Sequence, residues 1–165
     1  MKRIHIIGRK NSGKTTLIVE LVQHLSSRGY RVATVKHTHH QHELDTPGKD
    51  SYRHRLAGAA AVGILSPSLS AVFWPPAASE DGAARYDRLL ANFPDCDLVL
   101  VEGDSQANAI RIEVWRKAES ETPMVLDDKT ITGVVTDDDV QVPVPVWSRS
   151  DVATLAAKLF ELLGS

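Results

Sequence analysis

The sequence has only one cysteine, Cys96, among its 165 residues. One cysteine excludes a disulfide bond within the chain and any metal site that needs several thiolates. No apolar run approaches the ~20 residues that a transmembrane helix needs. The apolar stretch near the N-terminus is also too short for a signal peptide and continues directly into a glycine-containing loop. We therefore expect a cytoplasmic protein that does not act at a membrane.

A strong excess of either charge is also missing. The chain has 19 basic and 21 acidic residues, and aromatic residues make up only 5%. Proteins that bind nucleic acids usually carry a basic stripe interleaved with aromatic side chains, and no such stripe is present here. The composition thus predicts no nucleic-acid partner, and the length suits a single domain over residues 1–165.

The first forty residues predict a strand, a loop, a helix and a second strand. Residues 2–7 are rich in isoleucine, and leucines recur every four residues from Leu17 to Leu25. The helix is expected to end near residues 27–29, before a strand at 31–35. This βαβ order predicts a parallel sheet with a right-handed crossover.

The remaining pattern predicts an α/β protein with further strands and helices. The nearly continuous apolar run at 97–101 is typical of a central parallel strand. Residues 109–115 alternate in polarity, which predicts a half-exposed antiparallel strand, and residues 66–76 predict a strand or hairpin at the sheet edge. The expected architecture is a three-layer P-loop NTPase fold, mostly parallel with antiparallel additions. Its other elements are helices at 52–61 and 83–92, strands at 62–65 and 131–136, and a last helix capped by Ser150 or Asp151.

Residues 8–15, Gly-Arg-Lys-Asn-Ser-Gly-Lys-Thr, match the phosphate-binding pattern G-x-x-x-x-G-K-[ST]. In this motif backbone N–H groups curl around the β-phosphate, and glycine permits the close approach. We expect Lys14 to contact the β- and γ-phosphates and the Thr15 hydroxyl to bind Mg²⁺. A glycine turn before a helix is the alternative, but the flanking strand and helix favour the motif. The expected phosphate contacts are Gly8, Asn11, Ser12, Gly13, Lys14, Thr15 and Thr16.

A second carboxylate for magnesium is expected at the end of another central strand. Glu102 follows the apolar residues 98–101, at the edge where ligands bind in open α/β sheets. The alternative is a solvated glutamate, and the phosphate loop favours the magnesium role. Asp97, at the other end of this strand, is expected to be structural.

The polar segment after residue 35 contains four of the seven histidines. A nickel or zinc site at residues 37–42 is one interpretation, because imidazoles bind these metals. Closely spaced histidines on a loop point in different directions, so we favour His37 as a residue beside the triphosphate. Asp45 begins a D-x-x-G sequence like that of translational GTPases, although no buried strand precedes it here, and it can reach magnesium from a loop.

Asp137 is the candidate for reading guanine. GTPases use the aspartate of an [NT]-K-x-D motif to accept the guanine N1–H and 2-amino groups. This chain has only Val135-Thr136-Asp137 after a predicted buried strand. A charged loop with Asp138 and Asp139 is the alternative interpretation.

Several of these segments together resemble the MobB family of molybdopterin-guanine dinucleotide biosynthesis adaptor proteins. The resemblance covers residues 3 to about 137 and is most specific in the long block after the second strand. It depends on residues 8–16, on Lys36-His37-Thr38-His39-His40, on the run from Asp45-Thr46-Pro47-Gly48 to Ala57-Gly58-Ala59, on residues 97–103, and on Ile112-Glu113-Val114 with Arg116.

The resemblance implies a dimeric GTP-binding protein with weak GTPase activity that assists the guanylyltransferase joining GMP to molybdopterin. It implies that Lys14 and Thr15 hold phosphate and Mg²⁺, and that Asp45 and Glu102 complete the magnesium shell. The candidate catalytic residues are therefore Lys14, Asp45 and Glu102. Residues 51–54 would line a surface for molybdopterin, one of its intermediates, or a protein partner.

One departure from the family concerns the turn after Glu102. Family members commonly continue Glu-Gly with Phe-Lys, whereas here Gly103 is followed by Asp104 and Ser105. The loss of a lysine and the gain of an acid disfavour an anionic contact at this position. A nickel metallochaperone that uses the histidine cluster remains the main alternative function, and a small-molecule kinase ranks third because few arginines are available for a lid.

Overall fold

The computed structural model describes residues 2–40, 42–75, 81–93 and 95–164. The chain divides into two compact units, one formed by Met1–Thr38 with Phe93–Ser165 and the other by His39–Asn92. A single domain over the whole chain stays a prediction.

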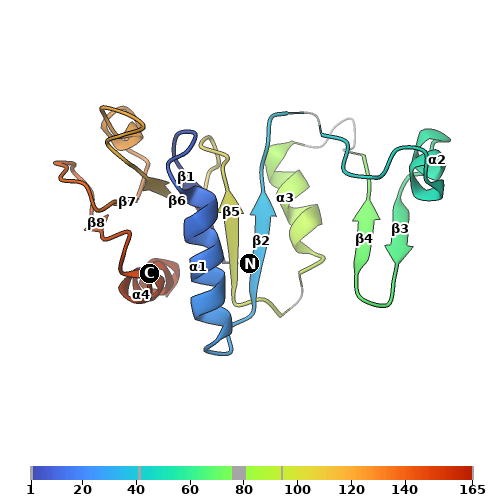
Figure 1. Ribbon diagram of the computed structural model, residues 1–165, viewed down its shortest axis with the longest axis horizontal. Helices are drawn as coiled ribbons and strands as arrows, with labels where there is room; N and C mark the ends of the chain where they lie inside the picture. The colour runs from blue at the N-terminus through green and yellow to red at the C-terminus, as the bar shows by residue number, and fades with distance from the viewer. Residues whose placement is uncertain (1, 41, 76–80, 94, 165) are drawn as a thin grey trace. The chain divides into compact units, whose positions relative to one another are not determined.

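The first unit is built on a six-stranded sheet whose strand order is β2-β5-β1-β6-β7-β8 (Figure 1). All of the strand pairs described in this sheet are parallel. The predicted α/β class with a mostly parallel sheet is confirmed. The elements are β1 (Arg3–Ile7), α1 (Lys14–Ser26), β2 (Val32–Lys36), β5 (Leu98–Glu102), β6 (Ile110–Val114), the 3-10 helix η1 (Met124–Leu126), β7 (Gly133–Val135), β8 (Val146–Trp147) and α4 (Val152–Gly164).

Alternate residues of the central strands face two different layers. Ile4 and Ile6 of β1 pack with buried leucines of α1 and α4, so these two helices cover one face. Ile7 and Val134 face the other way, where they pack with Val125 of η1. Both faces of β1 and β5 are therefore buried, which explains why residues 98–101 of β5 form a continuous apolar run. No described helix has the length and apolar character that crossing a membrane would require.

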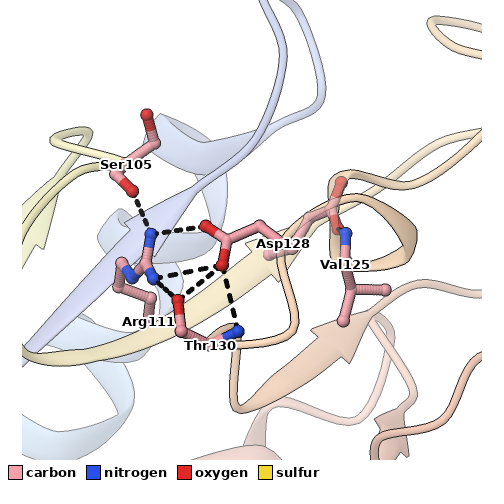
Figure 2. Close-up of polar contacts among 6 residues, drawn as sticks. Ser105, Arg111, Val125, Asp128 and Thr130 are labelled. Carbon is pink, nitrogen blue, oxygen red and sulfur yellow. Dashed lines mark hydrogen bonds and ion pairs between the residues drawn. The ribbon is translucent and has the colours of Figure 1, made fainter.

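The prediction for residues 109–115 was wrong in two respects. The strand β6 pairs in parallel with β1 and β7, and its polar residues Arg111 and Glu113 are buried. Arg111 is paired with Asp128 at 2.8 Å and also donates to the Thr130 hydroxyl and the Ser105 carbonyl oxygen (Figure 2). Alternation in polarity here reflects buried, partnered charges and does not mark a solvent-facing strand.

The backbone of η1 supplies hydrogen-bond donors to the buried carboxylate of Glu113. Its two carboxylate oxygens accept hydrogen bonds from the amides of Met124, at 2.7 Å, and Val125, at 3.0 Å. Burial nevertheless raises the pKa of Glu113 above its usual value, and the two amides oppose this rise. The same pair of bonds attaches the segment before β7 to the centre of the sheet.

The second unit contains a separate antiparallel hairpin. Its elements are α2 (Asp50–Leu56), β3 (Val62–Leu65), β4 (Ser70–Phe73) and α3 (Gly82–Leu90), and β3 pairs only with β4 among the described strands. The expectation that residues 66–76 extend the edge of the main sheet was therefore wrong, although its last residue lies outside the described part. The helix predicted at 52–61 ends earlier, because Gly58 adopts a positive φ of 94° that terminates it.

Aspartate side chains cap two of the described helices. Asp81 accepts a hydrogen bond from the Ala84 amide at the start of α3. Asp151 accepts one from the Thr154 amide, at 3.0 Å, and so is the cap of α4 in preference to Ser150. The strand β8 was missed, because two residues between prolines and serines give no periodicity to detect.

Candidate functional site

The phosphate-binding loop joins β1 to α1 at the carboxyl edge of the sheet. Gly8 has a φ of 142°, and a Cβ atom there would lie 2.3 Å from the Val114 carbonyl oxygen. Gly13 and Asn11 also have positive φ angles, of 96° and 63°. The loop is thus tightly curled against the end of β6, and glycine at position 8 is required both by φ and by space.

Lys14 folds over this loop. Its Nζ donates hydrogen bonds to the carbonyl oxygens of Gly8, at 2.9 Å, and Arg9, at 2.7 Å. Burial lowers the pKa of Lys14, Glu102 opposes the change, and the charge of Lys36 lowers the pKa further. The ammonium is therefore held against the loop, and its contact with a phosphate stays a prediction.

Ser12 and Thr16 complete the expected phosphate contacts. Ser12 is buried, and its Oγ makes no hydrogen bond to any residue that the structure describes. Thr16 lies exposed on the first turn of α1. Both residues are next in sequence to loop residues that are expected to contact a phosphate. Their own contacts with a phosphate stay predictions.

Thr15 and Glu102 are brought together by the pairing of β1 with β5. Glu102 is the register partner of Ile6, the residue two before Gly8. The Thr15 hydroxyl donates a hydrogen bond of 2.8 Å to Glu102 Oε1. A hydroxyl and a carboxylate at this separation are the hard oxygen donors that Mg²⁺ prefers, so the residues fit this ion. When bound, the ion would neutralise phosphate charge.

Lys36 is a functional candidate that the sequence reasoning missed. It ends β2 and is the register partner of Glu102, and its charge acts on Lys14. Within the described part of the chain it makes no ion pair, and its side chain is exposed. A lysine aligned with Glu102 could have been found by placing the ends of the two strands at the same sheet edge.

His37 follows at the same edge. Its backbone N–H donates to the Glu102 carbonyl oxygen at 2.9 Å, and its Nδ1 lies 3.6 Å from Asp104 Oδ2. His37 therefore lies beside Glu102, and its contact with a triphosphate stays a prediction. Asp104 is the carboxylate beside this histidine.

Asp137 lies just after β7, at the carboxyl edge on the other side of β1 from β2. Its Oδ1 accepts a hydrogen bond from Ser148 Oγ at 2.7 Å, and its Oδ2 accepts one from Ser150 Oγ at 2.5 Å. These bonds, led by that from Ser150, lower the pKa of Asp137 to about 2. The sequence reasoning missed both serines because their contact depends on the pairing of β7 with β8.

Asp45 belongs to the second unit. Its Oδ1 accepts hydrogen bonds from the Thr46 amide, at 2.8 Å, and from Ser51 Oγ, at 2.9 Å. Its Oδ2 is buried and makes no hydrogen bond to a described residue. Glu43 and Arg55 form an ion pair at 2.6 Å beside it. A free buried carboxylate oxygen suits a cation ligand, and its role in binding magnesium stays a prediction.

The histidine-rich segment shows no built metal site. Across residues 2–40, 42–75, 81–93 and 95–164, no group of three or more histidine, cysteine or carboxylate side chains could hold a metal ion. The rings of His40 and His42 meet edge to face at 5.9 Å.

Comparison with known proteins gives a consistent result. A family model described as "Molybdopterin guanine dinucleotide synthesis protein B" matches residues 3–137. A relative from Escherichia coli K12 named molybdopterin-guanine dinucleotide biosynthesis adapter protein is 33% identical over 146 residues, which are 88% of this chain and 83% of that protein. A Haemophilus influenzae protein of the same name is 35% identical over 134 residues, covering 79% of this chain and 72% of its own.

Solved structures agree with this result. A crystal structure described as molybdopterin-guanine biosynthesis protein B superposes with a TM-score of 0.73 at 32% identity, over 99% of both chains. The Bacillus subtilis MobB structure has a TM-score of 0.72 at 21% identity, over 99% of this chain and 98% of that one, and supports the fold alone. The nickel-chaperone alternative finds no support in these similarities.

Proposed function

Since this chain belongs to the MobB family of molybdopterin guanine dinucleotide synthesis proteins, we propose that it is an adapter that binds GTP with Mg²⁺ and assists the attachment of GMP to molybdopterin. The observation that carries the nucleotide part is the hydrogen bond of 2.8 Å between Thr15 and Glu102, directly beside Lys14. Loop amides, a cation and two oxygen ligands for magnesium are the groups that bind a triphosphate. Any GTPase activity is weak, with Lys14, Asp45 and Glu102 as the candidate catalytic residues.

Guanine selectivity in this proposal depends on Asp137. A carboxylate can accept both the N1–H and the 2-amino group of guanine, which adenine cannot offer. The hydroxyls of Ser148 and Ser150 keep the carboxylate ionised and oriented at the sheet edge. Ionised oxygens are acceptors only, so adenine is disfavoured at this position.

The proposed partners are the guanylyltransferase, molybdopterin or one of its intermediates, and a second copy of this chain, with a cytoplasmic location. The homodimer is supported by apolar side chains exposed on the hairpin β3–β4. Leu65 and Leu69 are 88% and 72% exposed, and Val72 is 53% exposed. An isolated two-stranded hairpin is marginally stable, so burial of these side chains against a partner would stabilise it.

Nucleotide titrations with a fluorescent GTP analogue, with and without Mg²⁺, test the proposal. Lys14→Met removes a charged hydrogen-bond donor, worth roughly 1.5–3 kcal/mol, so affinity should fall about ten- to a hundredfold. Glu102→Gln should weaken only the binding measured with Mg²⁺. Lys129→Met, an exposed lysine distant in sequence from the loop, is the matched control and should bind as the wild type does.

The guanine assignment needs a competition experiment. GTP should displace the analogue at lower concentration than ATP, and Asp137→Asn should reduce this preference. Asp139→Asn changes the same charge two residues away and should leave the preference unchanged. Equal affinities of the wild type for GTP and ATP would contradict the proposed guanine specificity.

A further inference from the structure

Residues 148–150 form a short segment that joins β8 to α4 in the first unit (Figure 1). Trp147, directly before the segment, packs against the main core, and Leu155 of α4 is buried in the same core. Because β8 runs parallel to β7, the segment lies at the carboxyl edge of the sheet, where Asp137 follows β7. Both ends of the segment are therefore fixed to the body of this unit.

The segment supplies the hydrogen bonds that orient the carboxylate of Asp137. Ser148 Oγ donates to Oδ1 at 2.7 Å and Ser150 Oγ donates to Oδ2 at 2.5 Å. The backbone N–H of Ser150 adds a third bond, to Oδ1, at 3.2 Å. A displacement of the segment would weaken these bonds, because hydrogen bonds are lost steeply with distance and angle.

The residue between the two serines makes a different contact. Arg149 Nη1 donates a hydrogen bond of 2.6 Å to Glu20 Oε2 on α1. The two side chains are only 20% and 39% exposed, so solvent screens this ion pair less than a fully exposed one. The bond from Arg149 also lowers the pKa of Glu20. This charge-assisted bond is therefore a firm link between the segment and α1.

Glu20 belongs to the helix that carries the expected phosphate contacts. Lys14 and Thr15 lie in the first turn of α1, and Glu20 follows Thr15 by five residues, about 7.5 Å along the helix axis. Another connection between the phosphate loop and Asp137 runs through the sheet and crosses three strand pairs, β1–β6, β6–β7 and β7–β8. The ion pair is a direct connection between the same two regions.

A nucleotide that contacts both regions needs them at a fixed separation. Its phosphates would lie on the loop at the start of α1, and its base would lie at Asp137. Since the nucleotide is one molecule, the carboxylate can accept hydrogen bonds from the base only if its distance from the loop matches the length of the nucleotide.

We propose that Glu20 and Arg149 are positioning residues for guanine recognition, whose ion pair holds residues 148–150, and through them Asp137, at the correct distance from the phosphate loop. This role rests on the proposed function, because it assumes that Asp137 reads guanine. The ion pair itself makes no contact with the nucleotide in this proposal. Affinity that comes from the phosphates alone should therefore not depend on it.

Competition titrations of GTP and ATP against the fluorescent GTP analogue test the proposal in the full-length chain. Arg149→Met and Glu20→Gln should each lower the affinity for GTP about three- to tenfold. The affinity for ATP should stay unchanged, which also shows that the variants are folded. The double variant should lose no more than either single variant, because both changes remove the same bond.

The matched control is another ion pair of the same unit. Lys158 of α4 lies 2.8 Å from Glu161 and is more exposed than Arg149. Lys158→Met removes a cation from that pair, and it should keep the wild-type preference for GTP over ATP.

A measurement without nucleotide separates positioning from direct electrostatics. The pKa of Asp137 can be followed by NMR through the chemical shift of its carboxyl carbon. Glu20→Gln removes a negative charge, so electrostatics alone would lower the pKa of Asp137 below about 2. Loosening of the serine bonds would instead raise the pKa toward 3.8, and this rise is the expected result.

The two proposals fail in different ways. A wild type that prefers GTP, together with a Glu20→Gln variant that keeps this preference and shows no rise in the pKa of Asp137, would overturn only the role of the ion pair. Equal losses of GTP and ATP affinity in the variants would also overturn it, because they would indicate a general effect on the phosphate helix. Equal affinities of the wild type for GTP and ATP would contradict the guanine assignment itself. A rise in the pKa of Asp137 in Glu20→Gln would then still support the ion pair as the group that orients this carboxylate.

Discussion

Two serine hydroxyls lower the pKa of the exposed carboxylate of Asp137. Hydrogen bonds from Ser150 and Ser148 lower its pKa from 3.8 to about 2. The bonds favour the ionised form, so they contribute stability above about pH 3.8 that is lost as the pH falls through about 2. The contribution is less than about 1 kcal/mol, because solvent screens an exposed carboxylate.

Asp137→Asn should therefore lower stability most at neutral pH. Urea unfolding of the wild type and the variant at pH 7 and at pH 3 checks this, and the difference in free energy of unfolding should shrink at the lower pH. Asp139→Asn serves as the control for a lost surface charge. A difference that stays constant or grows as the pH falls would contradict the role of the ionised form.

Single residues also show which features a local sequence pattern can predict and which it cannot. The spacing of Gly8, Gly13 and Lys14 in the sequence is sufficient to predict a phosphate loop, because the residues act through a continuous backbone. Lys36 and Glu102 are 66 positions apart and meet only through the pairing of β2 with β5. No local pattern marks Lys36, so its place beside Glu102 depended on the pairing of the two strands.

Among the elements, the helix α4 depends on its N-cap. Asp151 accepts the Thr154 amide, and the helix packs its Leu155 and Leu159 into the main core against α1. Loss of an N-cap typically costs about 1 kcal/mol. Asp151→Ala should therefore reduce the free energy of unfolding by roughly 1 kcal/mol, measured by urea denaturation.

The control for this prediction keeps the cap. Asp151→Asn retains a side-chain oxygen that can accept the amide, so it should cost much less than the alanine variant. If both variants lose the same stability, the charge of Asp151 and not its capping bond would be responsible.

The strand β6 shows why an element can be predicted while its environment is not. Alternation of polar and apolar residues at 109–115 correctly indicates a strand. The same alternation wrongly suggested exposure, because Arg111 is compensated by Asp128 and Glu113 by the amides of η1. Both partners follow in the sequence at a distance that only tertiary folding closes.

For the whole molecule, the exposed hairpin predicts self-association. Light scattering coupled to size exclusion should give the wild type twice the mass of the 18.1 kDa chain. Changing Leu65 and Leu69 to lysine together should shift the mass to that of one chain, because two charges replace the apolar contact. Val146→Lys, at an exposed valine of the first unit, should leave the dimer intact. A wild type that is monomeric at all concentrations would contradict the proposed homodimer.

The sequence by itself determined the βαβ start, the phosphate loop and the resemblance to the MobB family, because each depends on residues that are neighbours along the chain. It also placed Glu102 at a strand end, since a run of four apolar residues precedes it. Only the tertiary structure decided that all described pairs of the main sheet are parallel, that the hairpin forms a sheet of its own, and which groups partner Arg111 and Asp137. These features arise from strand pairing between distant segments, and hydrophobic periodicity carries no information about which strands become neighbours.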